Sequence, residues 1–353
     1  MPDRPAATSP STSPDNPAEA PDPVVAPDPD VVPPEDVLAL ARARADARKA
    51  RDFDSADRLR AQIEAAGWKI VDRGTDFSLE PAHPPDLTDG ARVRHGASSS
   101  VPSRLDAPTS APATVVLLAT DWPDDLARAL AGLRAYSAAG IQVVIVADDP
   151  SAAQAADLEA IDDADTGGAP DGGQEIVWTS ARLGTAAAID CGIRRAVGAV
   201  VVLLDTSIEP TGDIVTPLVA ALEDPSVAVT GGWGLVSDDL RTFRDAPPGD
   251  VDAIEGYCLA FRRTDFIARG PLDERFRFYR NLDIWWSLVL RDDGPGVPSR
   301  RAVRTAPLPA IRHEHRGYAS LPPAERDRLS KRNFYRIIGR FGSRRDLLIA
   351  SRG

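Results

Sequence analysis

The chain has 353 residues, 43% of them hydrophobic, which suits about two domains with a sizeable core. A net charge of −12 argues against a DNA-binding protein. Two cysteines, Cys191 and Cys258, are too few for a disulfide framework or a metal quartet, which fits a reducing cytoplasm. Both lie in apolar segments, where a buried thiol is expected. The sequence contains neither an apolar run of the roughly 18 residues that a membrane span needs nor a signal peptide.

Proline marks two segments as poor candidates for a packed core. Residues 1–34 combine Pro, Ala, Ser and Asp and are expected to be disordered, because they offer little apolar area to bury. Residues 83–112 are rich in Pro, Ser, Ala and Gly and are expected to form a linker. This division leaves a small module at 35–82 and a larger domain at 113–353.

The small module is predicted to contain two helices followed by a hairpin. Residues 35–66 are rich in Ala, Leu and Arg, with acids at the start, where a helix dipole favours them. Gly67 ends the second helix. The segments Trp68–Asp72 and Asp76–Leu79 then form the two strands of a hairpin.

The pattern RDF-x-x-AD-x-LR-x-x-I-x-x-x-G, from Arg51 to Gly67, resembles the C-terminal end of cysteinyl-tRNA synthetases. That resemblance implies a module that contacts tRNA or a protein. The alternative is a helical hairpin used for docking or assembly. We favour the alternative because acids and bases alternate and no basic face is visible, although RNA contact stays open.

From residue 113 onward, short strands alternate with helices, which predicts a mostly parallel α/β sheet with right-handed crossovers. The predicted strands are Thr114–Thr120, Ile141–Ala147, Glu175–Trp178 and Val200–Leu204. The predicted helices are Asp124–Ala138, Ser151–Ile161, Thr185–Val197.

Asp205 follows the strand Val200–Leu204, whose apolar run predicts burial on both faces. Ligands of open parallel sheets bind beyond the carboxyl ends of the strands. A carboxylate at this point is well placed to hold a divalent metal and, through it, a diphosphate. The alternative is that Asp205 only caps the following turn.

A series of motifs makes residues 113 to about 340 resemble the family 2 glycosyltransferases, which have the Rossmann-like GT-A fold. The matching segments are Arg182–Gly192, Leu203–Ser207, Gly256–Arg263, Gly270–Phe276, Arg280–Asp283 and His313–His315. The resemblance implies transfer of a sugar from a nucleotide-diphosphate donor, by an inverting displacement assisted by Mn²⁺ or Mg²⁺. The acceptor, a saccharide, lipid or protein, is not specified.

The resemblance also implies a donor site. Asp148 or Asp149, at the end of the second strand, would contact the base of the donor. Arg182 and Gly184 begin the helix that would border the donor. Asp205 would hold the divalent cation.

The sequence departs from the family pattern where the cation is expected. The last acid of the family's D-x-D motif is Ser207 here, and a neutral hydroxyl is a weak ligand for a hard cation. Glu209, two residues further on, is the predicted substitute, with His313 as a third ligand. His313 and His315 point to opposite sides in an extended chain, so one is expected to reach the metal or diphosphate and the other to pack.

A second departure concerns the general base. Asn281 stands where the family commonly has the acid that takes the acceptor's proton. Asp283 remains, and as a base it could deprotonate an acceptor hydroxyl if burial raises its pKa. Its alternative role is a favourable charge at a helix N-terminus. Glu255 is a second candidate base.

Because two expected acids are replaced, an alternative function is a non-catalytic protein that binds nucleotide-sugars or serves as a scaffold. A third hypothesis makes residues 35–79 the working part, in contact with RNA or a partner protein. The helix that carries Trp285 and Trp286 is not expected to direct both rings to one side.

Overall fold

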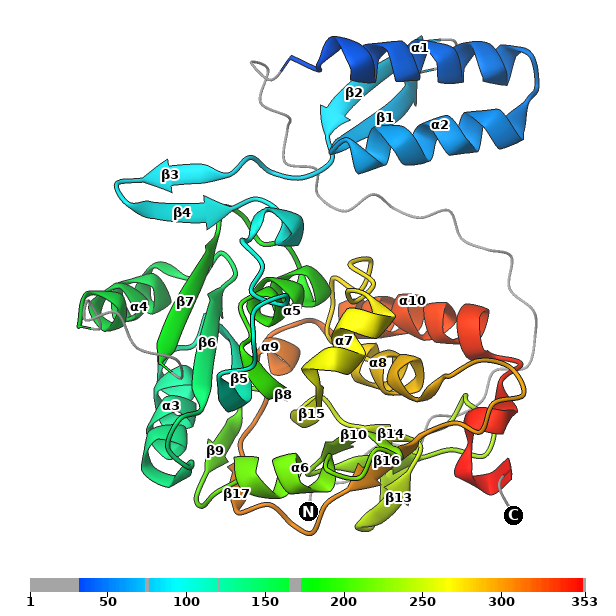
Figure 1. Ribbon diagram of the computed structural model, residues 1–353. Coiled ribbons are helices and arrows are strands. Elements are labelled where there is room, and N and C mark those ends of the chain that lie inside the picture. Colours follow the sequence, from blue (N-terminus) through cyan, green and yellow to red (C-terminus); the bar gives the residue numbers. More distant parts are fainter. Residues whose placement is uncertain (1–31, 74–75, 120, 165–172, 352–353) are drawn as a thin grey trace. The chain divides into compact units, whose positions relative to one another are not determined.

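The computed structural model, shown in Figure 1, describes residues 32–73, 76–119, 121–164 and 173–351. The chain divides into two compact units, one ending at Ala82 and the other beginning at His83. All but the last three residues of the predicted disordered tail lie outside the described residues. Each unit is considered by itself.

The first unit confirms the predicted pair of helices and hairpin. It contains α1 (Glu35–Lys49), α2 (Phe53–Ala65), β1 (Trp68–Arg73) and β2 (Asp76–Pro81). Asp52 caps α2 by accepting a hydrogen bond of 3.0 Å from the backbone N–H of Ser55. The core of the unit includes Val37, Ala41, Ile63 and Trp68, which place the helices on one face of the antiparallel β1–β2 pair.

The second unit is built on a ten-stranded, mostly parallel sheet, in the order β13-β16-β10-β15-β8-β5-β6-β7-β4-β3. Its strands are β3 (Leu87–Asp89), β4 (Arg92–His95), β5 (Ala111–Ala119), β6 (Gln142–Ala147), β7 (Gln174–Thr179), β8 (Gly198–Leu204), β10 (Val227–Gly231), β13 (Gly249–Val251), β15 (Cys258–Arg262) and β16 (Arg301–Arg304). Strands β4 to β8 run parallel, whereas β15 pairs antiparallel with both β8 and β10.

Two smaller sheets and a set of helices complete this unit. The smaller sheets contain β11 (Gly234–Val236), β12 (Arg244–Ala246) and β14 (Ala253–Ile254), and β9 (Ile208–Pro210) with β17 (Ala310–Arg312). The helices are α3 (Pro123–Tyr136), α4 (Ala152–Ala164), α5 (Thr185–Arg194), α6 (Val215–Ala221), α7 (Arg263–Arg269), α8 (Leu282–Arg291), α9 (Arg316–Ala319) and α10 (Pro323–Phe341), with short 3₁₀ turns η1 (Ser98–Ser100), η2 (Arg345–Leu347) and η3 (Ile349–Ser351).

Successive residues of a strand point to opposite faces of the sheet, and helices cover both of these faces. Val116 belongs to the cluster beneath α5 and α8, whereas Val115 and Leu117 belong to the cluster beneath α3 and α6. This arrangement explains why the central strands are apolar at consecutive positions. The predicted strands and helices from residue 114 to 204 are confirmed, with boundaries shifted by a few residues. The expected burial of Cys191 and Cys258 is confirmed as well.

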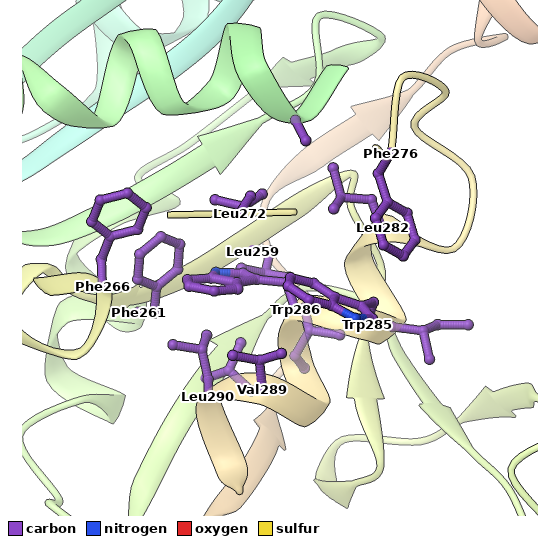
Figure 2. Packing of buried hydrophobic residues seen from close by; sticks show 14 of the residues in the cluster. Leu259, Phe261, Phe266, Leu272, Phe276, Leu282, Trp285, Trp286, Val289 and Leu290 are labelled. Carbon is purple, nitrogen blue, oxygen red and sulfur yellow. The ribbon is translucent and has the colours of Figure 1, made fainter. Parts of the chain in front are cut away.

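Helix α8 is buried along almost its whole length, and Figure 2 shows its two tryptophans packed into the same cluster. The rings of Trp285 and Trp286 are stacked, with centroids 6.1 Å apart and planes 20° apart. Trp286 packs against Phe261 and Phe266, whereas Trp285 packs against Phe276, so the two rings contact different neighbours, as expected. Both can be buried because the helix is apolar on nearly every side.

The segment 83–112 is not a plain linker, which corrects the sequence prediction. Strands β3 and β4 form a hairpin that extends the main sheet, with β4 parallel to the end of β7. The guanidinium groups of Arg92 and Arg94 lie 4.5 and 5.4 Å from the ring centroid of Trp178. Backbone pairing and these cation–π contacts stabilise strands that are too short and too polar to give a hydrophobic pattern.

Candidate functional site

Asp205 lies at the carboxyl end of β8 and faces His315. The antiparallel pairing of β9 with β17 brings the segment after Asp205 next to the segment before His315. A further backbone hydrogen bond of 2.8 Å, from His313 N–H to Ser207 C=O, extends this pairing. As a result, His315 Nε2 lies 3.1 Å from Asp205 Oδ2. Ser207 donates both its backbone N–H and its hydroxyl to Asp205 Oδ1.

The surroundings keep Asp205 ionised. Burial alone would raise the pKa of Asp205, but the hydrogen bonds and charge from His315 and the hydrogen bonds from Ser207 outweigh it and lower this pKa. Burial likewise acts to lower the pKa of His315, and Asp205 reverses this and raises it. The backbone N–H of Tyr318 donates to His315 Nδ1 over 3.0 Å, so the neutral imidazole carries its proton on Nε2, toward Asp205.

The ring of His315 is also held from its face. Tyr279 stacks on the imidazole with ring centroids 4.3 Å apart and planes 17° apart. Tyr318 approaches Tyr279 edge-on at 6.4 Å. These contacts fix both the position and the plane of a histidine that the sequence left undecided between metal contact and packing.

Glu209 and His313, the other two predicted metal ligands, form a pair of their own. His313 Nε2 lies 2.6 Å from Glu209 Oε2, and both side chains are about one-third exposed. Within residues 32–351, apart from the gaps given above, no three His, Cys, Asp or Glu side chains gather closely enough to hold an ion. The structure thus brings Asp205 together with His315, whereas metal binding by Asp205, Glu209 and His313 stays a prediction.

The predicted donor-base residues lie at the same edge of the sheet, since β6 and β8 both run parallel to β5. Asp148 is buried, and its Oδ1 accepts hydrogen bonds from Leu183 N–H at 2.8 Å and from the Thr179 hydroxyl at 3.3 Å. Burial raises the pKa of Asp148 to about 6, against the opposing effect of these hydrogen bonds and of the Arg182 charge.

Arg182 connects the loops that follow three strands. Its guanidinium contacts both carboxylate oxygens of Asp121, at 3.2 and 3.3 Å, and donates to the Asp149 carbonyl at 2.8 Å. Asp149 has a left-handed backbone with φ of 47°. Arg182 therefore holds together the rim of the edge at which Asp148 lies.

Gly184 directly precedes α5 and has φ of 94°, a conformation that L side chains rarely adopt. A Cβ atom there would lie only 2.9 Å from the backbone Cα of Arg277. The backbone N–H groups of Thr185 and Ala186 donate to the carbonyls of Arg277 and Phe276. Gly184 thus allows close approach of another loop, and its backbone N–H adds to the hydrogen bonds that act to lower the pKa of Asp148.

Asp283 is connected to Asp205 through two adjacent residues. Gly256 N–H donates to Asp283 Oδ2 at 2.9 Å, and Tyr257 C=O accepts from Asp205 N–H at 3.0 Å. Ile284 N–H donates to Asp283 Oδ1, as expected for an acid in the first turn of α8. Burial nevertheless raises the pKa of Asp283. A carboxylate with a raised pKa at this place is suited to accept a proton.

Glu255, the second candidate base, has a different environment. Its carboxylate lies 3.7 Å from the guanidinium of Arg312, which in turn sits 4.8 Å from the ring centroid of Tyr257. Asn281 has φ of 70° and donates its side-chain amide to the Ser330 carbonyl, so it holds α10 next to the start of α8. Asn281 has a structural role where the family commonly has an acid.

Tyr279 and Tyr318 are not recognisable as site residues from the sequence. Tyr279 precedes the start of α8 and reaches His315 only through the tertiary fold. Tyr318 lies in α9, where its backbone N–H donates to His315, three residues earlier in the chain. Between residues 305 and 325, Tyr318 is the only Phe, Trp or Tyr, so the sequence gives no signal for the stacking of Tyr279 on His315.

A hollow of about 640 Å³ lies elsewhere in the second unit, between β4, β7 and the turn at Val101. Its lining shares no residue with the group around Asp205. The guanidiniums in its wall are already paired, Arg92 with Glu159 and Arg195 with Glu175. We assign no function to it.

Comparison with solved structures identifies the class of fold. The chain aligns with GalNAc-T7, crystallised with UDP, GalNAc and Mn²⁺, at a TM-score of 0.51 and 15% identity, over 66% of this chain and 48% of GalNAc-T7. The mannosyltransferase PcManGT from Pyrobaculum calidifontis, in complex with GDP-Man and Mn²⁺, aligns at a TM-score of 0.45 and 16% identity, over 70% of this chain and 75% of that protein. The likeness to GalNAc-T7 shows that the chain contains a GT-A-like fold, and the chain spans about half of GalNAc-T7.

Comparison of the sequence with known families and proteins adds two partial matches to the likeness of fold. Residues 114–280 match the family described as Glycosyl transferase family 2, so the chain contains a domain like those of that family. Over 44 residues it is 54% identical to the cysteine–tRNA ligase of Opitutus terrae, which is 12% of this chain and 10% of the ligase. Among the described helices, none combines the length and the hydropathy needed to span a bilayer.

Proposed function

We propose that this protein is a glycosyltransferase that uses a nucleotide-diphosphate sugar as donor. The observation that carries the proposal is the link through Gly256 and Tyr257, which joins an ionised Asp205 to an Asp283 of raised pKa. One carboxylate is suited to hold charge and the other to take a proton. The family likeness of residues 114–280 supports the same function.

The donor would lie along the edge formed by β5, β6 and β8. Asp148, with its neighbour Asp149, would orient the nucleoside, and Arg182 with Gly184 would shape the rim beside it. The exposed carboxylate of Asp149 makes no hydrogen bond within the described residues and is open to a ligand, whereas the buried Asp148 already accepts from Leu183 and Thr179 and would hold the loop beside the base. The diphosphate would then extend toward Asp205.

A divalent cation, Mn²⁺ or Mg²⁺, fits the residues at this position only in part. Asp205 Oδ2 and His315 Nε2 face each other at 3.1 Å, and the Ser207 hydroxyl is adjacent to the same carboxylate. To hold a cation between them, Nε2 would first give up the proton that it directs toward Asp205. Carboxylate and imidazole together suit Mn²⁺ better than Mg²⁺. Diphosphate and water would supply the other ligands, and the bound ion would offset the charge that develops on the leaving diphosphate.

In the proposed reaction, an acceptor hydroxyl oxygen attacks the anomeric carbon of the donor sugar. The bond from that carbon to the diphosphate oxygen breaks, and the hydroxyl proton passes to Asp283. Attack from the face opposite the leaving group inverts the anomeric configuration. Glu255 is the weaker candidate for the base because its carboxylate already faces Arg312.

A donor screen tests the proposal. We expect UDP- or GDP-sugars to raise the melting temperature in the presence of Mn²⁺ and to be converted to the free nucleoside diphosphate. A protein that is stabilised by a donor but releases no diphosphate with any acceptor would instead be the non-catalytic binding protein. A protein that shows neither response refutes both functions.

A further inference from the structure

Two arginines of the second unit lie against the ring of Tyr318 without a carboxylate partner among the described residues. The guanidinium carbons of Arg280 and Arg326 are 5.7 and 4.5 Å from the ring centroid of Tyr318. Within the described residues, neither side chain has a hydrogen bond or an ion pair. Other arginines of this unit are paired, for example Arg344 with Asp292 and Asp346.

The backbone that carries Arg280 is firmly attached to the helix that carries Arg326. Asn333, fully buried on α10, donates its side-chain amide to the carbonyls of Phe278 and Arg280, at 2.7 and 2.8 Å. In return, Asn281 donates to the Ser330 carbonyl of α10 at 3.0 Å. The backbone segments that carry the two arginines are therefore held next to each other.

Arg280, the nearer of the two to the candidate base, lies on the side of the site where the acceptor is proposed to bind. Burial raises the pKa of Asp283, Tyr257 and Tyr279, and the charge of Arg280 opposes that rise in all three. Arg280 is thus close to the group that would take the proton of the acceptor. The diphosphate of the donor is expected at Asp205, where Arg280 is not among the main influences on the carboxylate.

Resting on the proposed function, we infer that the acceptor carries an anionic group, a phosphate or a carboxylate, that is bound by Arg280 and Arg326. Guanidinium groups bind such oxygens through two parallel hydrogen bonds. Two unpaired guanidiniums fixed about one aromatic ring favour this ligand over a neutral sugar, which would leave both charges without a partner. Tyr318, which also donates its backbone N–H to His315, connects the anion site to the donor site.

The test measures nucleoside-diphosphate release with matched acceptors, using the donor that stabilises the protein best. The neutral probes are glucose, mannose and glycerol. The anionic probes are glucose 6-phosphate, mannose 6-phosphate, glycerol 3-phosphate and glucuronate, which distinguish phosphate from carboxylate. We expect at least one anionic probe to be used about tenfold or more better than its neutral counterpart, because a charged hydrogen bond is lost with the neutral one.

Variants locate the effect. Arg280→Gln and Arg326→Gln should each raise the KM for the anionic acceptor about tenfold or more, with the stabilisation by donor retained. Arg280→Lys, which keeps the charge without the planar fork, should lose less. Arg328→Gln is the matched control, because Arg328 lies on the same helix and pairs with Glu325.

Equal use of neutral and anionic probes, or variants that weaken donor binding as much as acceptor use, would overturn this inference and leave the proposed function intact. A wild-type protein that no nucleotide-sugar stabilises would overturn both.

Inorganic phosphate should inhibit in competition with the acceptor. Competition with the donor alone would assign the two arginines to the diphosphate and so contradict the inference.

Discussion

Asp205 and Asp283 show how two parts of one site give the same side chain opposite properties. Asp205, at the end of β8, accepts from Ser207 and faces His315, and these contacts lower its pKa despite burial. Asp283, at the start of α8, accepts only backbone N–H groups among the described residues, and burial raises its pKa. The comparison teaches that the partners of a carboxylate, more than its burial, decide whether it holds a positive charge or takes a proton.

The largest expected loss of activity comes from removing the negative charge of Asp205. Asp205→Asn should reduce nucleoside-diphosphate release at least about a thousandfold, because the amide can neither hold a cation nor balance the charge of His315. The measurement is release of the diphosphate with and without Mn²⁺. A variant that retains more than a tenth of the wild-type rate would show that the two carboxylates do not differ in the way proposed.

Replacing Asp283, the proposed base, should give the next largest loss of activity. Asp283→Asn should reduce transfer about a hundredfold or more, because the amide takes no proton, whereas donor binding should persist. For the wild-type protein, the transfer rate should fall as the pH drops through the raised pKa of Asp283, since only the ionised form is a base. A rate that does not change with pH in this range, or a variant with full activity, would contradict the role of Asp283.

Asp148 extends the comparison to stability. Its folded pKa of about 6 lies above the ordinary value of 3.8, so the protonated form favours folding, and this contribution is present at low pH and lost as the pH rises through 6. Asp148→Asn should therefore raise the free energy of unfolding by up to about 3 kcal/mol at pH 8 and by little at pH 3. Urea unfolding at the two pH values measures this, and a variant that is less stable at pH 8 would refute it.

The smallest expected effect is on Mn²⁺ binding, and it distinguishes His315 from His313. His315→Gln should weaken Mn²⁺ binding in the presence of nucleoside diphosphate about tenfold or more, whereas His313→Gln should change it about twofold, because His313 pairs with Glu209. Titration with Mn²⁺ monitored by electron paramagnetic resonance measures both affinities. The reverse order would favour the ligand set of Asp205, Glu209 and His313 that the sequence predicts.

Much of the fold was predictable, because strands such as Val200–Leu204 are apolar at consecutive positions and the helices between them have clear starts. The strands β3 and β4 were not, since three or four polar residues form a strand only when a neighbouring edge is available. Asp205 and Asp283 were predictable as candidates from their places in the chain. Their different pKa values were not, because His315 and Gly256 reach them only through tertiary contacts.

A crystal structure of the protein with UDP or GDP and Mn²⁺, located by the anomalous signal of manganese, tests the central claim most directly. We predict a manganese peak in contact with Asp205 and His315, with the diphosphate bound to it and the base directed toward Asp148. A nucleotide bound elsewhere would contradict the account. So would a manganese ion bound away from Asp205 and His315, with the contact between these two side chains unchanged.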